Sequence, residues 1–176
     1  MHTIQYIATQ ASDVDHAFRS VKNYLETQLG NDPESTTNSW FDWFVTGGGR
    51  WATGDENQYN DNWTGDVVHQ DSPKFQEYLD KATKFRKDTL DEYLADIRKL
   101  DLQQTLDSIE ISGGDDFRAG MYLYPFSQVY DITMGTWNYN SYYYDIMSDS
   151  ANMIHLKNSL DNGGKNWYLV PVDFHF

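Results

Sequence analysis

The chain has 176 residues, which fits a single domain over residues 1–176 and is long enough to bury a core. Its formal net charge is −14, so its surface repels nucleic acid and anionic membranes, and we expect no direct binding to either. The absence of cysteine excludes disulfides and thiol chemistry. The lack of a long apolar run or a basic, signal-like N-terminus predicts a cytoplasmic protein with no membrane span.

The chain opens with a predicted strand and a predicted helix. Residues 3–9 are rich in β-branched and aromatic side chains, which favours a strand. Ser12 predicts a helix N-cap, and apolar residues then recur at helical spacing up to Gly30, a typical helix end. After a polar loop, residues 40–45 predict a second strand, and residues 53–71 predict a long ordered loop or lid.

The middle of the chain contains the longest predicted helix. Ser72, followed by proline, is a typical helix start, and one apolar face continues to Leu100. The outer face concentrates Lys and Arg, which we interpret as a solvated surface with ion pairs three or four positions apart. Residues 102–111 could form a short helix or a strand, and residues 121–126 and 128–133 predict strands.

The C-terminal part predicts one short helix and a final strand. Residues 151–160 favour the helix, whereas the tyrosine-rich residues 135–148 predict no element. Residues 167–176 favour the strand, in which Pro171 indicates an edge position or a bulge. These elements predict an α+β fold, an antiparallel sheet with helices on one face, with a ferredoxin-like arrangement with insertions as the first hypothesis.

Residues 42–51 combine several features of a ligand site. A predicted strand leads into three glycines, which free the backbone and can expose N–H groups to an anion. Arg50 offers a rigid fork of donors for phosphate or carboxylate, and the flanking tryptophans can stack on a planar ring. The spacing matches neither the P-loop nor the dinucleotide fingerprint. An equally compatible interpretation is structural, with Arg50 paired to Asp42 or Asp173 and the tryptophans in the core.

The histidines and carboxylates suggest a second part of this site. Asp173 and His175 are two positions apart in the final strand, so they share one face and suit acid–base work or an anion contact. The alternative is an exposed pair on an edge strand. His2 would lie beside them if the first and last strands pair, whereas Asp145 is interpreted as a surface residue. Zinc-binding spacings are missing from the sequence, so no metal or cofactor is expected.

Two segments resemble a known group of proteins. Residues 42–51 resemble the Asp-Trp-Tyr-x-x-Gly-Gly-Arg-Trp signature of small uncharacterised bacteriophage-encoded proteins, with one additional glycine and Phe44 in place of tyrosine. Residues 172–175 are similar to their Val-Asp-x-His ending. The resemblance covers the first third of the chain and its final strand. It implies a phage origin and a pocket that pairs the Gly-Arg loop with the terminal Asp and His.

We therefore predict a phage counter-defence binding protein, a sponge that sequesters a small anionic, nucleotide-type immune signalling molecule in the host cytoplasm. The residues expected to bind this ligand are Asp42, Trp43, Gly48, Gly49, Arg50, Trp51, Asp173 and His175. Three alternatives stay open: an enzyme that cleaves phosphoesters or cyclic nucleotides, an acidic DNA mimic that inhibits a host nuclease, and a virion or assembly component with the tyrosine-rich stretch as an interface. The sequence also leaves open whether the protein forms a homo-oligomer.

Overall fold

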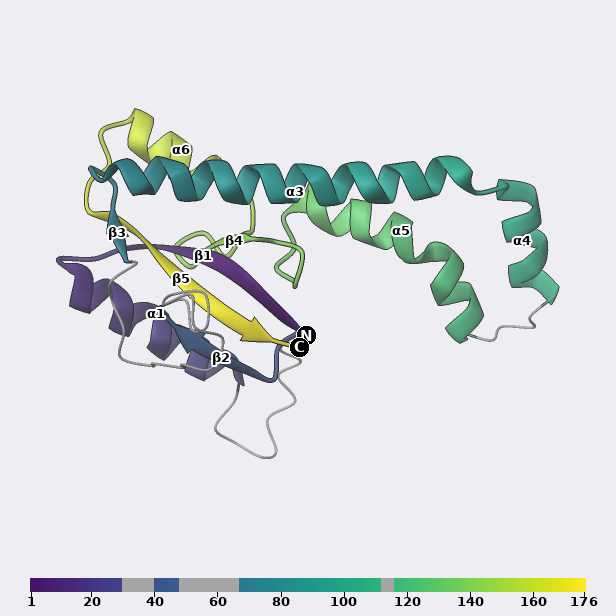
Figure 1. The fold of residues 1–176 in the computed structure, drawn as a ribbon, viewed down its shortest axis with the longest axis horizontal. Helices are drawn as coiled ribbons and strands as arrows, with labels where there is room; N and C mark the ends of the chain where they lie inside the picture. The colour runs from purple at the N-terminus through teal and green to yellow at the C-terminus, as the bar shows by residue number, and fades with distance from the viewer. Residues whose placement is uncertain (30–39, 48–66, 112–115) are drawn as a thin grey trace.

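The computed structural model describes residues 1–29, 40–47, 67–111 and 116–176, and it has one sheet surrounded by helices (Figure 1). The strands are β1 (His2–Gln10), β2 (Trp43–Thr46), β3 (Val68–His69), β4 (Tyr143–Asp145) and β5 (Trp167–His175). The helices are α1 (Val14–Leu29), α3 (Pro73–Lys99), α4 (Leu102–Ile111), α5 (Asp116–Met134) and α6 (Ile154–Asp161). The strand order is β2-β5-β1-β4, with β3 also on β5, and only the β1–β4 pair is parallel.

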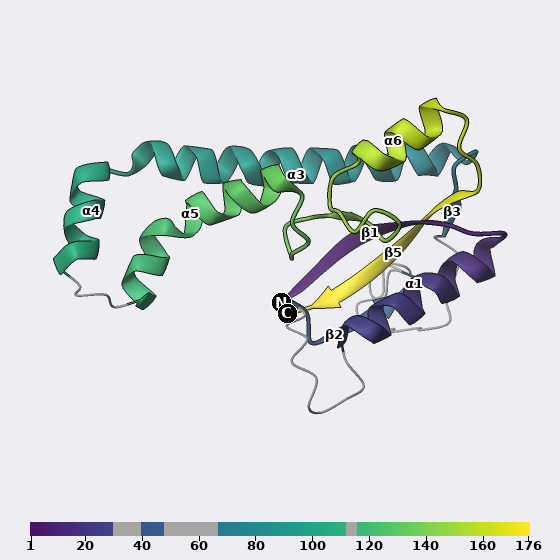
Figure 2. The same ribbon diagram turned by 180° about the vertical axis from the view of Figure 1, so that it is seen from behind.

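Helices cover both faces of this sheet (Figures 1 and 2). Side chains alternate between the faces along β1. Ile7 packs in one cluster with Val21 of α1, whereas Tyr6 packs in another with Leu79 of α3 and Leu156 of α6. The α+β class with a mostly antiparallel sheet is confirmed. The expectation of helices on one face is wrong, because β1 has apolar side chains on both of its faces, and a ferredoxin-like arrangement is not confirmed.

β5 is a central strand, buried from Trp167 to Phe174. The prediction that Pro171 marks an edge or a bulge is therefore wrong. Pro171 lies opposite Tyr6 of β1, and its carbonyl accepts the Gly47 N–H at 2.7 Å, so its polar backbone atoms face away from β1. On that side, pairing with β3 ends at residue 169 and pairing with β2 begins at residue 172. The missing N–H of proline thus falls between two short strands, where it costs no ladder hydrogen bond.

Helices α1 and α3 begin close to their predicted positions. Ser72 caps α3, since its hydroxyl accepts the Lys74 N–H at 3.3 Å, and a proline follows. In α1 the capping side chain is Asp13 rather than Ser12, because the Asp13 carboxylate accepts the His16 N–H at 2.8 Å. That hydrogen bond lowers the pKa of Asp13. A carboxylate at this position is also favoured by the partial positive charge of the helix N-terminus.

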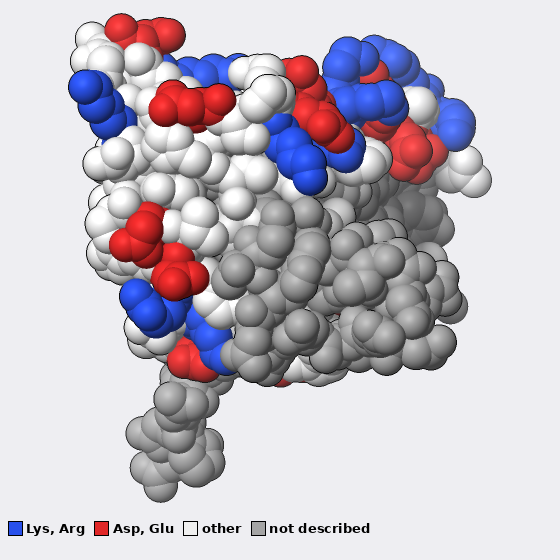
Figure 3. All heavy atoms as spheres, turned by 60° about the vertical axis from the view of Figure 1, so that its left-hand side comes forward, with Lys and Arg blue, Asp and Glu red and all other residues white. Residues whose placement is uncertain are grey.

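The outer face of α3 carries lysines in ion pairs, as predicted. The pairs are Lys81–Glu77, Lys84–Asp88, Lys87–Asp91 and Lys99–Asp96. Figure 3 shows basic and acidic side chains interspersed along the top of the molecule, over α3. Exposed pairs at this spacing are strongly screened by solvent, so they support the helix only modestly.

The C-terminal part of α3, α4 and α5 form a helical arm beside the sheet (Figure 1). α3 extends past the sheet, α4 lies at its far end, and α5 returns. The strands predicted at 121–126 and 128–133 are wrong, since both segments belong to α5. Gln128 and Ile132, four positions apart, are its buried side chains in the part of α5 whose side chains are described, which is a helical rather than a strand period. None of the described helices is both long and apolar enough to cross a membrane.

The structure assigns elements to several segments for which the sequence gave no definite prediction. Residues 102–111, which could be helix or strand, form α4. The tyrosine-rich residues 135–148 contain β4. Within the predicted lid, residues 68 and 69 form β3 on β5, whereas residues 53–66 lie outside the described residues, as does Gly30. The predicted second strand begins at Trp43, three residues later than expected.

Candidate functional site

The predicted site residues that the structure describes come together at one end of the sheet. Asp42 directly precedes β2 and Trp43 begins it, while Asp173 and His175 lie in the last part of β5. In the β2–β5 register, Trp43 is opposite His175. The remaining predicted residues, Gly48, Gly49, Arg50 and Trp51, lie outside the described residues.

His2 joins this group, as expected from pairing of the first and last strands. The β1–β5 register places His2 opposite His175. The Nδ1 atom of His2 lies 3.0 Å from Oδ1 of Asp173, and Nδ1 of His175 lies 2.7 Å from Oδ1 of Asp42. Asp173 and His175 therefore share a face, as predicted, but each is hydrogen-bonded to a different residue. We call His2, Asp42, Trp43, Asp173 and His175 the strand-end cluster.

The three rings of the strand-end cluster pack on one another. Trp43 and His175 are stacked, with centroids 5.1 Å apart and planes inclined by 7°. His2 meets both rings edge-on, at 5.1 Å from Trp43 and 4.9 Å from His175. A carboxylate at each Nδ1, the stacking of Trp43 on His175 and the edge contacts of His2 fix the orientation of the imidazoles. The cluster is thus preorganised to present two histidines at one surface.

Burial differs sharply between the two carboxylates of the cluster. The side chain of Asp173 is fully buried and that of His2 is 16% exposed, whereas Asp42 is 64% exposed. The hydrogen bond from His175 lowers the pKa of Asp42. Because this pKa is depressed, the pair stabilises the fold above the ordinary carboxyl value of 3.8, and the contribution is lost as the pH falls through the lowered value.

A groove lies on the same face of the sheet, between the sheet and α3. Its sheet side is formed by Ile4, Tyr6 and Pro171. Ile4 and Pro171 are each two positions from a member of the strand-end cluster, His2 and Asp173, so they continue the same face. The groove has a volume of about 410 Å³. We call it the α3 groove.

The α3 side of this groove is basic and aromatic. Its lining residues on the helix are Lys74, Glu77, Tyr78, Lys81 and Phe85. Tyr78 stacks on Tyr6 across the groove, with centroids 4.4 Å apart and planes inclined by 24°. The Lys81 ammonium lies 2.8 Å from Glu77 and 5.8 Å from the centroid of the Tyr78 ring. The sequence interpretation favoured a solvated surface over a binding patch for these lysines and missed the groove, because its other side comes from distant strands.

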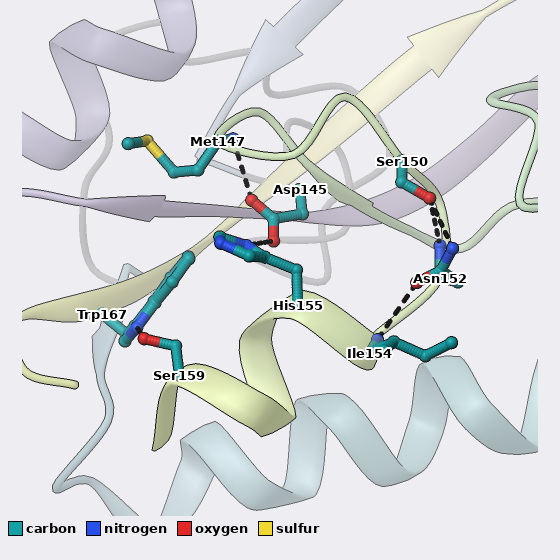
Figure 4. Close-up of polar contacts among 8 residues, drawn as sticks. All are labelled: Asp145, Met147, Ser150, Asn152, Ile154, His155, Ser159 and Trp167. Atoms are coloured by element: carbon teal, nitrogen blue, oxygen red, sulfur yellow. Dashed lines mark hydrogen bonds and ion pairs between the residues drawn. The ribbon is translucent and has the colours of Figure 1, made fainter. Parts of the chain in front are cut away.

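A second histidine–carboxylate pair joins β4 to α6 (Figure 4). Asp145 is fully buried, so its interpretation as a surface residue is wrong. One of its oxygens lies 2.7 Å from Nδ1 of His155, and the other accepts the Met147 N–H at 2.8 Å. The His155 ring also meets the edge of Trp167. This pair holds the start of α6 against the sheet, and sequence spacing gave no indication of it.

Folding changes the surroundings of several tyrosine hydroxyls, including a pair beside β4. The hydroxyls of Tyr24 and Tyr144 are 2.6 Å apart, and Tyr144 also donates to Asp149. Burial is the main cause of a raised pKa in six tyrosines: Tyr24, Tyr93, Tyr124, Tyr139, Tyr143 and Tyr144. For Tyr93 the pKa rises to about 12.

These raised pKa values predict loss of stability in alkali. A tyrosine whose pKa is raised by folding contributes stability that is full below its ordinary value of 10.0 and is lost as the pH rises through the folded value. We expect phenolate absorbance of the native protein to develop in two stages, with the later one near pH 12 coinciding with loss of circular dichroism. The control is the same titration in denaturant, which should give a single stage near pH 10. Superimposable native and denatured curves would contradict the buried tyrosines.

No family model, curated protein or solved structure matches this chain. Within the parts of the chain that the structure describes, no three His, Asp or Glu side chains are arranged to hold a metal ion. Interpretation of the site therefore rests on its own geometry. That geometry is a groove lined by lysines and aromatic rings, on the same face of the sheet as two oriented histidines and a tryptophan.

Proposed function

We propose that this chain is a binding protein that captures a small anionic molecule of nucleotide type in the α3 groove. The observation that carries the proposal is the placement of the groove and the strand-end cluster on one face of the sheet, where a single ligand can contact both. The groove supplies cations and aromatic rings, and the cluster supplies two imidazoles.

The lining of the groove suits both parts of a nucleotide. Lys74 and Lys81 offer ammonium groups for phosphate oxygens, and a charge-assisted hydrogen bond of this kind contributes about 1.5–3 kcal/mol. Phe85, which is 41% exposed, offers aromatic surface to a base. These features matter more because the whole chain carries −14, so a local group of lysines is what allows an anion to approach.

The size of the groove also fits. Small-molecule sites generally have volumes of about 300–1,000 Å³, and the α3 groove measures about 410 Å³. On the same face of the sheet, His2 and His175 are held by carboxylates in fixed orientations. Fixed side chains bind with a smaller loss of conformational entropy than mobile ones. A mononucleotide or a compact cyclic nucleotide therefore suits the site better than a long polyanion.

The biological role that we propose is sequestration of a nucleotide signal of host immunity. It rests on the resemblance of residues 42–51 and 172–175 to phage-encoded proteins, and on the suitability of the groove for such ligands. Sequestration needs tight binding and no chemistry. A binding protein of this kind lowers the free concentration of the signal in proportion to its own abundance.

A thermal-shift screen tests the binding function. The purified protein is heated with mononucleotides, cyclic dinucleotides and nicotinamide-derived compounds. A ligand at 100 times its Kd stabilises the folded state by about 2.7 kcal/mol, which for a chain of this size raises the melting temperature by about 5–10 °C. We expect a shift with one of these classes. If none of them shifts the transition at millimolar concentration, the nucleotide proposal fails.

A phosphoester-cleaving enzyme is the second candidate, favoured by one observation: Asp173 is buried and hydrogen-bonded to His2, as in carboxylate–histidine pairs that act as general bases. The two functions differ in what happens to the ligand. A binding protein releases the molecule intact on denaturation, whereas an enzyme releases a product. Mass spectrometry of the released ligand distinguishes them. The DNA-mimic alternative gains no support, because the acids of α3 alternate with lysines.

A further inference from the structure

The helical arm exposes an unusual amount of apolar surface. The buried side chains of α3 are Phe75, Tyr78, Leu79 and Ala82, all in its N-terminal part over the sheet. In the arm, Leu90, Leu94 and Ile97 of α3 are only half-buried. A two-helix layer has one interior face, and α5 alone cannot enclose these side chains. The arm therefore has a thinner core than the sheet.

One face of α5 is an outward apolar seam. It consists of Leu123, Phe126, Tyr130 and Met134, which are 47%, 37%, 62% and 59% exposed. Their spacings of three, four and four place them along one side of the helix. Gln128 and Ile132, which are buried, lie on the opposite side. We call these four residues the α5 seam. Such a row of apolar side chains is typical of a helix that packs against another helix.

We propose that the α5 seams of two copies of this chain pack against each other, so that the arms form a symmetric dimer. α3 and α5 of each copy would then supply the four helices of a bundle. A two-fold dimer requires a surface that is complementary to itself. The α5 seam meets this requirement, because its four side chains are uncharged and their three-and-four spacing is that at which like helices interlock.

The amount of surface agrees with a dimer. Six large apolar side chains, the four of the α5 seam with Leu102 and Leu106 of α4, are exposed by between 37% and 62%. At roughly 200 Å² for each large side chain, they present on the order of 650 Å². A standard interface buries about 800 Å² on each partner. The arm projects beside the sheet, so a second arm can approach without contact between the two sheets (Figure 2).

The salt dependence of association distinguishes a second copy of this chain from a basic protein as the partner. Each copy carries −14, so two copies repel at long range, and added salt screens that repulsion. Dimerisation through an apolar seam should therefore strengthen as salt increases. Binding to a basic protein would weaken under the same conditions. Because the α5 seam is uncharged, a second copy of this chain suits it better than a basic protein does.

Sedimentation velocity over a range of concentrations tests the dimer. We expect the wild-type protein to reach twice the mass of the 20.5 kDa chain. The double variant Phe126→Glu with Tyr130→Glu places four carboxylates in the interface, and we expect its dimerisation to be weakened at least about 100-fold. The control Met147→Glu adds a charge at a side chain that is 51% exposed in the turn after β4, and it should dimerise normally. A monomeric wild type at every concentration, or a double variant that still dimerises, overturns the proposal.

Cross-linking gives a second measurement that does not depend on introduced charges. The chain has no cysteine, so a single one reports its own neighbourhood. We expect Tyr130→Cys, near the middle of the seam, to be joined into dimers by a short bifunctional thiol reagent at low protein concentration. Met147→Cys, with the same chemistry, should remain monomeric on denaturing gels. Equal cross-linking of both variants, or none at Tyr130→Cys while the protein sediments as a dimer, places the interface elsewhere.

Discussion

Reversing the charge of Lys74 and Lys81 together should weaken ligand binding at least about 100-fold while leaving the fold intact. Each ammonium is expected to make a charge-assisted hydrogen bond worth about 1.5–3 kcal/mol to the anion, and about 1.4 kcal/mol corresponds to a factor of ten. Glutamate at both positions also repels the ligand. The measurement is isothermal titration calorimetry of Lys74→Glu with Lys81→Glu against the compound found by thermal shift.

The same helix offers a matched control. Lys84 and Lys87 are 72% and 70% exposed, form the same kind of ion pair one turn further along, and do not line the groove. Lys84→Glu with Lys87→Glu changes the net charge equally and removes two exposed ion pairs, whereas Lys74→Glu with Lys81→Glu removes the Lys81–Glu77 pair. We expect its affinity to change by less than about threefold, the part due to long-range charge. If both double variants lose the same affinity, binding depends on overall charge and not on the α3 groove.

The salt dependence of ligand affinity distinguishes long-range repulsion by the acidic surface from the direct contacts of the two lysines. A net charge of −14 opposes every anion, so the affinity of the wild-type protein should increase with moderate salt if long-range repulsion dominates. It should decrease if the contacts of Lys74 and Lys81 dominate. We expect the second result. Lys81 lies close to both Glu77 and the Tyr78 ring, which orients its ammonium beside the groove.

The elements predicted correctly have signals that are local in the sequence. The start of α3 could be predicted because a serine N-cap followed by proline satisfies the first backbone N–H groups without tertiary contacts. The helical face of α1 follows from apolar spacing, and Phe18, Val21 and Leu25 are buried as that spacing requires. Its cap lies one residue later than predicted, because Ser12 and Asp13 are both good caps and only the geometry selects between them.

Two incorrect predictions relied on residue composition where the periodicity of apolar residues was the better signal. The sequence of α5 favours two strands because it is rich in aromatic and β-branched residues, although Leu123, Phe126, Tyr130 and Met134 already have a helical period. One proline led to the prediction of β5 at an edge. Its nearly continuous apolar run is typical of a strand covered on both faces, and that signal was the more informative one.

The candidate site was predictable only in part, because its geometry depends on strand register. The two-residue spacing of Asp173 and His175 correctly placed them on one face. Their hydrogen-bond partners, His2 and Asp42, come from other parts of the sheet and are fixed by the pairing of β5 with β1 and β2. The buried position of Asp145 likewise depends on the parallel pairing of β4 with β1, which no local pattern encodes.

Phe174→Ala should strongly destabilise the fold, because Phe174 lies at the centre of the aromatic cluster on the α1 face of the sheet. Its side chain is fully buried, and its ring centroid lies 4.8 Å from that of Phe41, 4.9 Å from that of Trp40 and 6.0 Å from that of Trp137. Removing a buried phenylalanine side chain costs about 3–5 kcal/mol, which for a chain of this size lowers the melting temperature by about 6–20 °C. Differential scanning calorimetry measures this shift.

The control lies two residues further along the chain. Phe176 is half-buried and stacks on Tyr139 at the surface, so Phe176→Ala removes a ring of the same size without opening a cavity in the core. We expect it to cost about 1 kcal/mol, or about 2–4 °C. Since β5 also carries Asp173 and His175, loosening this core should displace the strand-end cluster, and Phe174→Ala should lose ligand affinity below its melting temperature. Similar melting temperatures for the two variants would contradict the central position of β5 and, with it, the geometry on which the α3 groove depends.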